Sequence, residues 1–190
     1  MIDAPHVPIM LDKMCKNLLH KKDGIYLDGT VGFGGHSAKI LDYIDSNGYL
    51  IGLDLDPYAL EYSNKHLSVH LNSFSLHHAN YKEFPDIINS LGIEKLNGML
   101  FDLGTSSYQV DSEHRGFSYR FNGPLNMKFN QNSTHNNAEH IINNYSEKDL
   151  SDIIRIYGEE RYHRRIAKSI VEKRKKKKIK DTFGLKQVII

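Results

Sequence analysis

The chain has 190 residues, of which 39% are hydrophobic and 25% are charged, an ordinary composition for a globular domain with its own core. Residues 1–160 carry 13 Lys and Arg against 21 Asp and Glu, whereas residues 161–190 carry 12 against 2; an acidic body with a basic end is typical of a protein that contacts a polyanion. A single cysteine and the lack of an apolar run of roughly 18 residues exclude a disulfide scaffold and a membrane-spanning protein.

Strand and helix patterns alternate over the first hundred residues. Short apolar runs predict strands at 24–28, 49–54, 74–79 and 98–102, and helical patterns between them predict helices at 36–45, 57–67 and 83–91. Pro57 suits the first position of its helix, and Asp56 either faces the solvent or belongs to the N-terminus of that helix. The alternation predicts an α/β fold with a parallel sheet of about four strands.

The chain changes in character after residue 102. Residues 103–137 are rich in Ser, Asn, Gly and aromatic residues without a sustained period, which indicates an ordered functional loop. A helix is expected from Ser146, whose spacing to Asp149 resembles a capping box. Another is expected over about 159–173 with Tyr162, Ile166 and Ile170 on one face, and Thr182 is expected to cap a third.

A glycine-dense segment over residues 28–36, Asp-Gly-Thr-Val-Gly-Phe-Gly-Gly-His, joins the first strand to the first helix. Such a turn lets a ligand approach the backbone at a helix N-terminus. The dinucleotide fingerprint would require glycine at position 37, where Ser37 stands. An acidic residue followed by dense glycines is instead typical of an S-adenosylmethionine site; a glycine-rich turn without a ligand is the structural alternative.

Asp54 closes the second strand, twenty residues after Gly34. A carboxylate in this place can accept hydrogen bonds from both hydroxyls of a ribose, in a dinucleotide site and in an S-adenosylmethionine site alike. The residue therefore supports a nucleotide-like cofactor without deciding which one it is.

Five motifs in order make the chain resemble, from His6 to Ile190, the family of bacterial-type 16S rRNA cytosine-N4 methyltransferases. They lie at 6–11 (His-Val-Pro-Ile-Met-Leu), 28–37, 101–111 (Phe-Asp-Leu-Gly-Thr-Ser-Ser-Tyr-Gln-Val-Asp), 115–125 (Arg-Gly-Phe-Ser-Tyr through Gly-Pro-Leu) and 157–167 (Tyr-Gly-Glu-Glu-Arg through Arg-Ile-Ala). The resemblance implies S-adenosylmethionine-dependent methylation of the N4 amine of a cytosine in small-subunit ribosomal RNA. It also implies a Rossmann-like class I methyltransferase sheet with a helical insertion domain at its C-terminal end.

The resemblance implies roles for individual residues. Gly34, Gly35 and His36 match the cofactor loop, where backbone amides meet the methionine end, and Asp54 matches the ribose ligand. Tyr81 stands where the family usually has Phe and would contact the adenine, with a core aromatic as the alternative. The remaining cofactor-contacting positions are matched by Asp102 and Gln109.

Asp102 is also the candidate catalytic residue. The lone pair of a cytosine N4 is delocalised into the ring, so an enzyme must hold this nitrogen in line with the methyl donor and accept hydrogen bonds from the amine. Amino-methyltransferases more widely have Asp/Asn-Pro-Pro-aromatic here, whereas residues 102–105 are Asp-Leu-Gly-Thr, so that analogy does not carry over residue by residue. The target base must be unstacked to reach the site.

RNA contact is expected at the basic end, through Arg161, Arg164 and Arg165. For the lysine-rich run 173–178, phosphate contact and a solvated helix face remain equally open. The expected partner is small-subunit ribosomal RNA or the assembled small subunit, and a homodimer is left open.

The expected organisation is a cofactor-binding core at 1–110, a substrate loop at 111–137 and a basic helical domain at 138–190. The eleven histidines are scattered, so no metal site is assigned, and the start of the chain has no signal- or transit-peptide pattern. We therefore expect a cytoplasmic protein without membrane contact.

The sequence departs from the family pattern in two ways. Asn122, Asn126 and Lys128 stand where the family usually has two acids and an arginine. The family's later strands and its Phe-His-Ser-Leu-Glu-Asp-Arg-type motif are not present, which would leave a sheet edge exposed. We therefore expect a fragment of a longer product or an inactive copy; the alternatives to an active enzyme are a remnant that at most binds rRNA and, with less support, an NAD-dependent oxidoreductase.

Overall fold

Four parallel strands form one sheet in the order β3-β2-β1-β4, in a computed structural model that describes residues 8–70 and 73–190. The strands are β1 (Ile25–Asp28), β2 (Tyr49–Asp54), β3 (Phe74–His78) and β4 (Gly98–Leu100). The three pairings are parallel, with Leu27 opposite both Ile51 and Met99. The predicted α/β fold with four parallel strands is confirmed, and the strand order reverses between β1 and β4, where ligands bind in open sheets of this kind.

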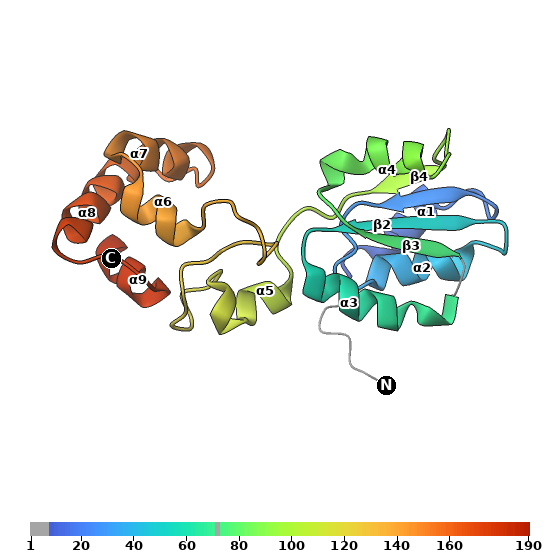
Figure 1. Ribbon diagram of the computed structural model, residues 1–190, viewed down its shortest axis with the longest axis horizontal. Coiled ribbons are helices and arrows are strands. Elements are labelled where there is room, and N and C mark those ends of the chain that lie inside the picture. Colours follow the sequence, from blue (N-terminus) through green and yellow to red (C-terminus); the bar gives the residue numbers. More distant parts are fainter. Residues whose placement is uncertain (1–7, 71–72) are drawn as a thin grey trace. The chain divides into compact units, whose positions relative to one another are not determined.

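Helices cover both faces of the sheet (Figure 1). On one face, α1 (Leu11–Leu18), α2 (Gly35–Tyr43) and the end of α3 (Pro57–His66) enclose a core that includes Tyr26, Ile40 and Leu50. On the other face, α4 (Phe84–Ser90) packs over Leu27 and Ile51. Neighbouring residues of β1 and β2 thus point to opposite layers, as the two-residue period of a strand requires. Met99 on the edge strand β4 is 47% exposed.

The helix boundaries follow local signals in the sequence. Asp56 caps α3 by accepting a hydrogen bond from the backbone N–H of Tyr58, and Pro57 occupies the first turn. Asp56 is buried, so the interpretation as a solvent-facing residue is wrong and the interpretation as part of the helix N-terminus is confirmed. Helix α1 was not expected from the sequence, because Met10 at its N-cap makes no side-chain capping bond.

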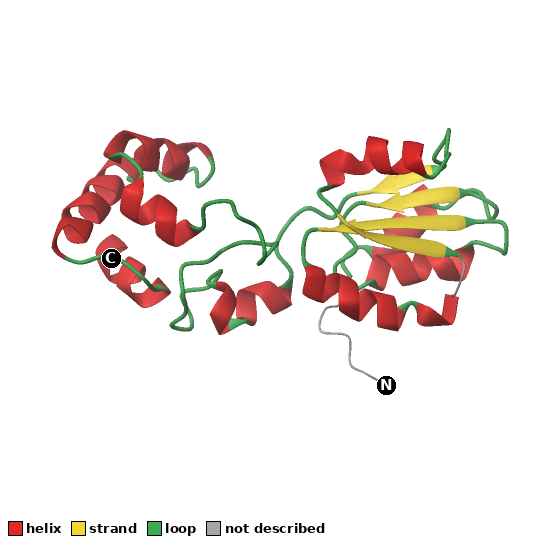
Figure 2. Cartoon of the chain, in the orientation of Figure 1, coloured by secondary structure: helices red, strands yellow, loops and turns green. Residues whose placement is uncertain are grey.

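The chain divides into two compact units, Met1–Ser106 with Phe129–Gln131, and Ser107–Lys128 with Asn132–Ile190. The expected substrate loop at 111–137 is therefore not a part of its own, since most of it belongs to the second unit. In Figure 2 the strands all lie in the first unit, whereas the second consists of helices and loops. Its α-helices are α5 (Ser107–Asp111), α6 (Ala138–Asn144), α7 (Glu147–Ile156), α8 (His163–Lys176) and α9 (Thr182–Ile189).

The second unit has a core of its own, formed by Leu125, Leu150, Ala167, Ile170 and Ile179. Leu125 brings the loop into this core, and the neighbouring Pro124 forms an isolated bridge with Asp181. The segment between α5 and α6 is thus packed against the helices of the second unit.

Three expectations for these helices need correction. The helix expected from residue 159 begins at His163. Glu159 has a left-handed backbone conformation with φ of 51°, which is incompatible with a right-handed α-helix. Ile166 and Ile170 belong to the core as expected, but Tyr162 precedes the helix and is exposed. Asp181 caps α9 through the N–H of Gly184, and Thr182 is the first helical residue. Ser146 caps α7 as expected.

None of the helices in the described part of the chain is long and apolar enough to cross a membrane.

Candidate active site

Three aspartates meet at one edge of the sheet. Asp28 ends β1 and Asp54 ends β2, while Asp102 follows β4 by two residues. The carboxyl ends of parallel strands lie at the same edge, and β1 and β4 flank the point where the strand order reverses. This edge is where a ligand of an open α/β sheet is expected.

Asp28 stabilises the glycine loop by hydrogen bonds. It is fully buried, and its carboxylate accepts hydrogen bonds from the Ser37 hydroxyl at 2.7 Å and from the Thr30 N–H at 3.1 Å. Burial raises the pKa of Asp28 from 3.8 to about 6, although both hydrogen bonds oppose the shift. Asp28 therefore serves the loop and the first turn of α2 rather than facing a ligand.

Asp54 links the glycine loop to the start of α3. Its Oδ2 accepts from the Gly32 N–H at 2.7 Å and its Oδ1 accepts from the Asp56 N–H at 2.8 Å. Burial raises the pKa of Asp54 as well, while these two backbone bonds lower it. Each carboxylate oxygen can accept more than one hydrogen bond, so the side chain retains capacity for a diol.

The backbone conformation and packing of the loop require glycine at some positions, whether or not a ligand binds. Gly34 adopts φ of 82° at the N-cap of α2, and a Cβ on Gly35 would lie 2.8 Å from Pro8. The loop is thus shaped for tight packing whether or not a ligand binds, so the glycines alone do not identify a cofactor. The N-terminus of α2 is more informative, because no side chain among the described residues caps it. The first-turn amides of Gly35 and His36 are suited to an anionic group.

The His36 side chain joins the N-terminal segment to the end of β4. Its Nε2 lies 3.0 Å from the backbone oxygen of Ile9, and its Nδ1 lies 3.9 Å from Oδ2 of Asp102. The ring is buried, whereas the Asp102 side chain is 34% exposed. The backbone N–H of Asp102 donates to Thr30 Oγ1 at 2.7 Å, which fixes this residue to the glycine loop.

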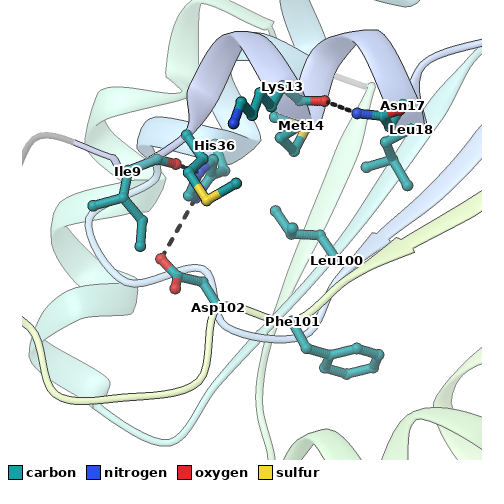
Figure 3. Close-up of a pocket in the computed structure, with 10 residues that line it drawn as sticks. Ile9, Lys13, Met14, Asn17, Leu18, His36, Leu100, Phe101 and Asp102 are labelled. Carbon is teal, nitrogen blue, oxygen red and sulfur yellow. Dashed lines mark hydrogen bonds and ion pairs between the residues drawn. The ribbon is translucent and has the colours of Figure 1, made fainter.

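A pocket of about 370 Å³ opens beside His36 and Asp102 (Figure 3). Leu100 points toward α1, and the Phe101 ring points to the other side of the strand. Sequence reasoning missed the contribution of α1, although apolar residues at 11, 14, 15 and 18 have helical spacing. The volume is in the range of small-molecule sites. The residues that line it are Ile9, Met10, Lys13, Met14, Asn17, Leu18, His36, Leu100, Phe101 and Asp102.

Tyr81 lies at the start of a short 3-10 turn (Tyr81–Glu83) after β3. It is 43% exposed, so it is not the core aromatic that was the structural alternative. Its ring meets the edge of Phe101 at a centroid distance of 5.8 Å. The two rings form an aromatic surface in the first unit, next to the strand ends.

The other candidate residues belong to the second unit. Gln109 is buried in α5. Arg161, Arg164 and Arg165 are exposed around the start of α8. Arg174 of the same helix donates to the carbonyls of Ile142 and Tyr145, at 2.6 and 2.5 Å, so it closes the C-terminal end of α6. The basic end is therefore a mixture of structural and exposed cations.

Within residues 8–70 and 73–190, no group of three or more His, Cys, Asp or Glu side chains is arranged to hold a metal ion. Of the five motifs, His6 and Val7 of the first one lie outside the described residues.

Comparison with known proteins places this chain in a family. The model of the MraW methylase family matches residues 3–190. The chain is 42% identical over 184 residues to the ribosomal RNA small subunit methyltransferase H of Caldicellulosiruptor saccharolyticus, covering 97% of this chain and 59% of that protein. It is 45% identical over 171 residues to the protein of the same name from Thermosipho africanus, covering 89% of this chain and 57% of the relative.

The chain thus spans somewhat less than three fifths of the length of these relatives. A crystal structure of an rRNA methylase from Streptococcus thermophilus is similar at 20% identity and a TM-score of 0.42, over 55% of this chain and 58% of that one. The fold assignment therefore rests on the strand order described above, and the family on the match over residues 3–190. The chain belongs to the MraW methylase family.

Proposed function

We propose that the protein methylates the exocyclic N4 amine of a cytosine in small-subunit ribosomal RNA, with S-adenosylmethionine as the methyl donor. The observation that carries the proposal is that Asp54, the uncapped N-terminus of α2 and Asp102 lie at the carboxyl ends of the strands, in a chain of the MraW methylase family. The relatives bear the name of a ribosomal RNA small subunit methyltransferase. Their name supports the substrate class.

The residues of the first unit fit S-adenosylmethionine by their chemistry. The first-turn amides of Gly35 and His36, next to Gly34, would receive the carboxylate of the methionine end. Asp54 would accept from the ribose hydroxyls, and Tyr81 would contact the adenine. Gln109 remains a candidate on the resemblance alone. When bound, the cofactor supplies an electrophilic methyl group at a sulfonium.

Asp102 would position the amine and take up its proton. Its backbone is held by Thr30, and its partly exposed carboxylate adjoins the pocket, where it can accept a hydrogen bond from the N4 amine. The new nitrogen–carbon bond would form as the methyl carbon–sulfur bond breaks and leaves a neutral thioether, and the Asp102 carboxylate would accept the one proton that the nitrogen loses. The pocket lined by α1 and Leu100 would take the unstacked base and exclude water from it.

The exposed cations Arg161, Arg164 and Arg165 would hold the RNA through its phosphates. They support affinity without reading the sequence, because phosphate contacts position a nucleic acid and do not distinguish bases. The partner in this proposal is the small-subunit rRNA, free or in the assembled subunit.

Calorimetric titration with S-adenosylmethionine tests the cofactor site. Asp54→Asn keeps a side-chain oxygen for the loop but removes the charge, and should weaken binding roughly 10- to 100-fold, as for the loss of a charge-assisted hydrogen bond. Asp86→Asn, an exposed carboxylate on α4, is the matched control and should bind as the unaltered chain does. Equal affinity of all three chains, with thermal unfolding unchanged, would remove Asp54 from the site.

Incubation with radiolabelled donor and small subunits lacking the modification tests the reaction. Nucleoside digestion should yield N4-methylated cytidine, and Asp102→Asn should reduce its rate by at least 100-fold, the range of a positioned acid–base group. A chain that binds the cofactor but methylates neither subunits nor naked rRNA would leave the family membership intact and contradict the proposed activity.

A further inference from the structure

The turn between α7 and α8 presents two tyrosines to the solvent. Tyr157, at the C-terminal end of α7, is 83% exposed, and Tyr162, immediately before α8, is 46% exposed. Large aromatic side chains bury most of their surface when they serve a core. Neither tyrosine belongs to the core of the second unit.

The backbone of this turn is fixed. Glu159 adopts φ of 51°, and a Cβ on Gly158 would lie 2.7 Å from the carbonyl of Ile154. The N–H groups of Glu159 and Glu160 donate to the carbonyls of Arg155 and Ile154, at 3.1 and 3.3 Å. A non-glycine residue held in the left-handed region is uncommon and is often found at functional sites.

A side-chain bond also joins the two helices across the turn. Ser151 Oγ on α7 lies 2.7 Å from Nδ1 of His163, the first residue of α8. The exposed tyrosines are therefore carried by a pre-ordered element, which reduces the entropy that binding must offset.

Two arginines lie beside the ring of Tyr162. The guanidinium carbon of Arg161 lies 4.5 Å from the centroid of the Tyr162 ring, and that of Arg165 lies 5.6 Å from it. Of the two acids in the turn, Glu160 is engaged with the backbone, since its Oε1 accepts from the N–H of Tyr162 at 2.7 Å. The turn thus combines exposed tyrosine side chains with exposed cations around the start of α8.

We propose that the α7–α8 turn and the first residues of α8, together residues 157–165, form a stacking platform for an unpaired nucleobase of RNA. Tyr157 takes the base, because the ring of Tyr162 is already covered by arginine, and Arg161 and Arg164 contact the flanking phosphates. Aromatic rings beside arginines bind single-stranded RNA by stacking and charge together. The inference deepens the proposed function, from which it takes RNA as the ligand.

Fluorescence anisotropy with a labelled single-stranded RNA of twelve nucleotides tests the platform on the full chain. Tyr157→Ala should weaken binding roughly 5- to 100-fold, the range for loss of one base–aromatic stack, and Tyr157→Phe should retain it. The salt dependence of Tyr157→Ala should match that of the unaltered chain. Arg164→Gln should instead lower the slope of log K against log salt by about 0.7, the value for one phosphate contact on a single strand.

An abasic strand of the same length separates stacking from folding. On that strand the unaltered chain and Tyr157→Ala should bind equally, because there is no base to stack. Equal affinity of the two chains for the normal RNA would overturn the inference, as would a loss that persists on the abasic strand. The assay contains no cofactor, so a failure of methyl transfer leaves its outcome unaffected, and a methylating chain that is indifferent to Tyr157→Ala would refute the platform alone.

Discussion

The Nδ1 atom of His36 lies 3.9 Å from Oδ2 of Asp102, while Nε2 of the same ring lies 3.0 Å from the carbonyl oxygen of Ile9. A carbonyl can only accept, so Nε2 carries the proton in that bond and Nδ1 is the nitrogen that faces the carboxylate. The buried ring thereby connects the segment before α1 with the end of β4. Asp28 is the other acid whose charge interacts with His36.

Two replacements separate the structural and electrostatic parts of this arrangement. His36→Gln can still donate to Ile9 and should leave the free energy of unfolding within about 0.5 kcal/mol, whereas His36→Leu loses the bond and should cost about 1–3 kcal/mol. Both remove the ring that faces Asp102, so both should slow methyl transfer. Denaturant unfolding and rate measurements quantify the two effects. Equal stability of the two variants would mean that the bond to Ile9 contributes nothing.

The buried carboxyl of Asp28 predicts a pH dependence of stability. Its pKa is raised from 3.8 to about 6 by burial, so the folded state holds the proton more tightly than the unfolded state does. The contribution to stability is therefore complete below about pH 4 and is lost as the pH rises toward 6 and above. At about 1.4 kcal/mol per pKa unit, the loss amounts to about 3 kcal/mol.

Asp28→Asn removes this titration and serves as the reference. The free energy of unfolding of the variant, minus that of the unaltered chain, should rise by up to about 3 kcal/mol between pH 4 and pH 7. Other titrating groups cancel in the difference, because both chains contain them. A difference that is constant across this range would show that Asp28 does not titrate within it.

Much of the first unit was predictable because its signals are local. The strand 49–54 was predicted with the bounds of β2, since an apolar run between turn residues leaves little choice. Pro57 marked the start of α3, because the first residues of a helix do not need their N–H groups for intrahelical hydrogen bonds and proline lacks one. Helix α1 escaped prediction because Met10 provides no capping signal, although its apolar spacing was readable.

What the sequence did not reveal depends on long-range contacts. No local pattern indicates that His36 reaches Ile9, 27 residues earlier, or that Arg174 reaches the end of α6. The left-handed Glu159 is not a residue type that predicts such a conformation, so the start of α8 was placed too early. For the candidate site, the residue types were predictable from motifs, whereas the side-chain role of His36 and the pocket wall from α1 required the structure.

Thr182 joins residues 121–123 to the start of α9 in the second unit. Its Oγ1 donates to the carbonyl of Phe121 at 2.7 Å and accepts from the N–H of Gly123 at 3.1 Å. Thr182→Val is nearly isosteric and leaves both groups without this partner, so it should destabilise the second unit by about 1–3 kcal/mol. Thr182→Ser retains the hydroxyl and should cost less. Hydrogen exchange of the amides in residues 121–125 measures the effect, and equal protection in both variants would contradict the prediction.

Arg174 and Lys175 are neighbours in α8 with different expected roles. Arg174 is half-buried and donates to the carbonyls of Ile142 and Tyr145, whereas Lys175 is exposed. Arg174→Gln should therefore destabilise the second unit by about 1.5–3 kcal/mol, the range for hydrogen bonds from a charged group. Lys175→Gln should leave stability unchanged, because exposed charges on a helix contribute little.

The same pair distinguishes the two interpretations of the lysine-rich run 173–178. If the run contacts RNA phosphates, Lys175→Gln should lower the slope of log K against log salt for single-strand binding by about 0.7. Arg174→Gln, measured below its unfolding transition, should leave this slope unchanged, because the Arg174 guanidinium is bound to the carbonyls of α6. An unchanged slope in Lys175→Gln would assign position 175 to a solvated face. A lowered slope in Arg174→Gln would mean that Arg174 leaves the carbonyls of α6 and contacts a phosphate when RNA binds.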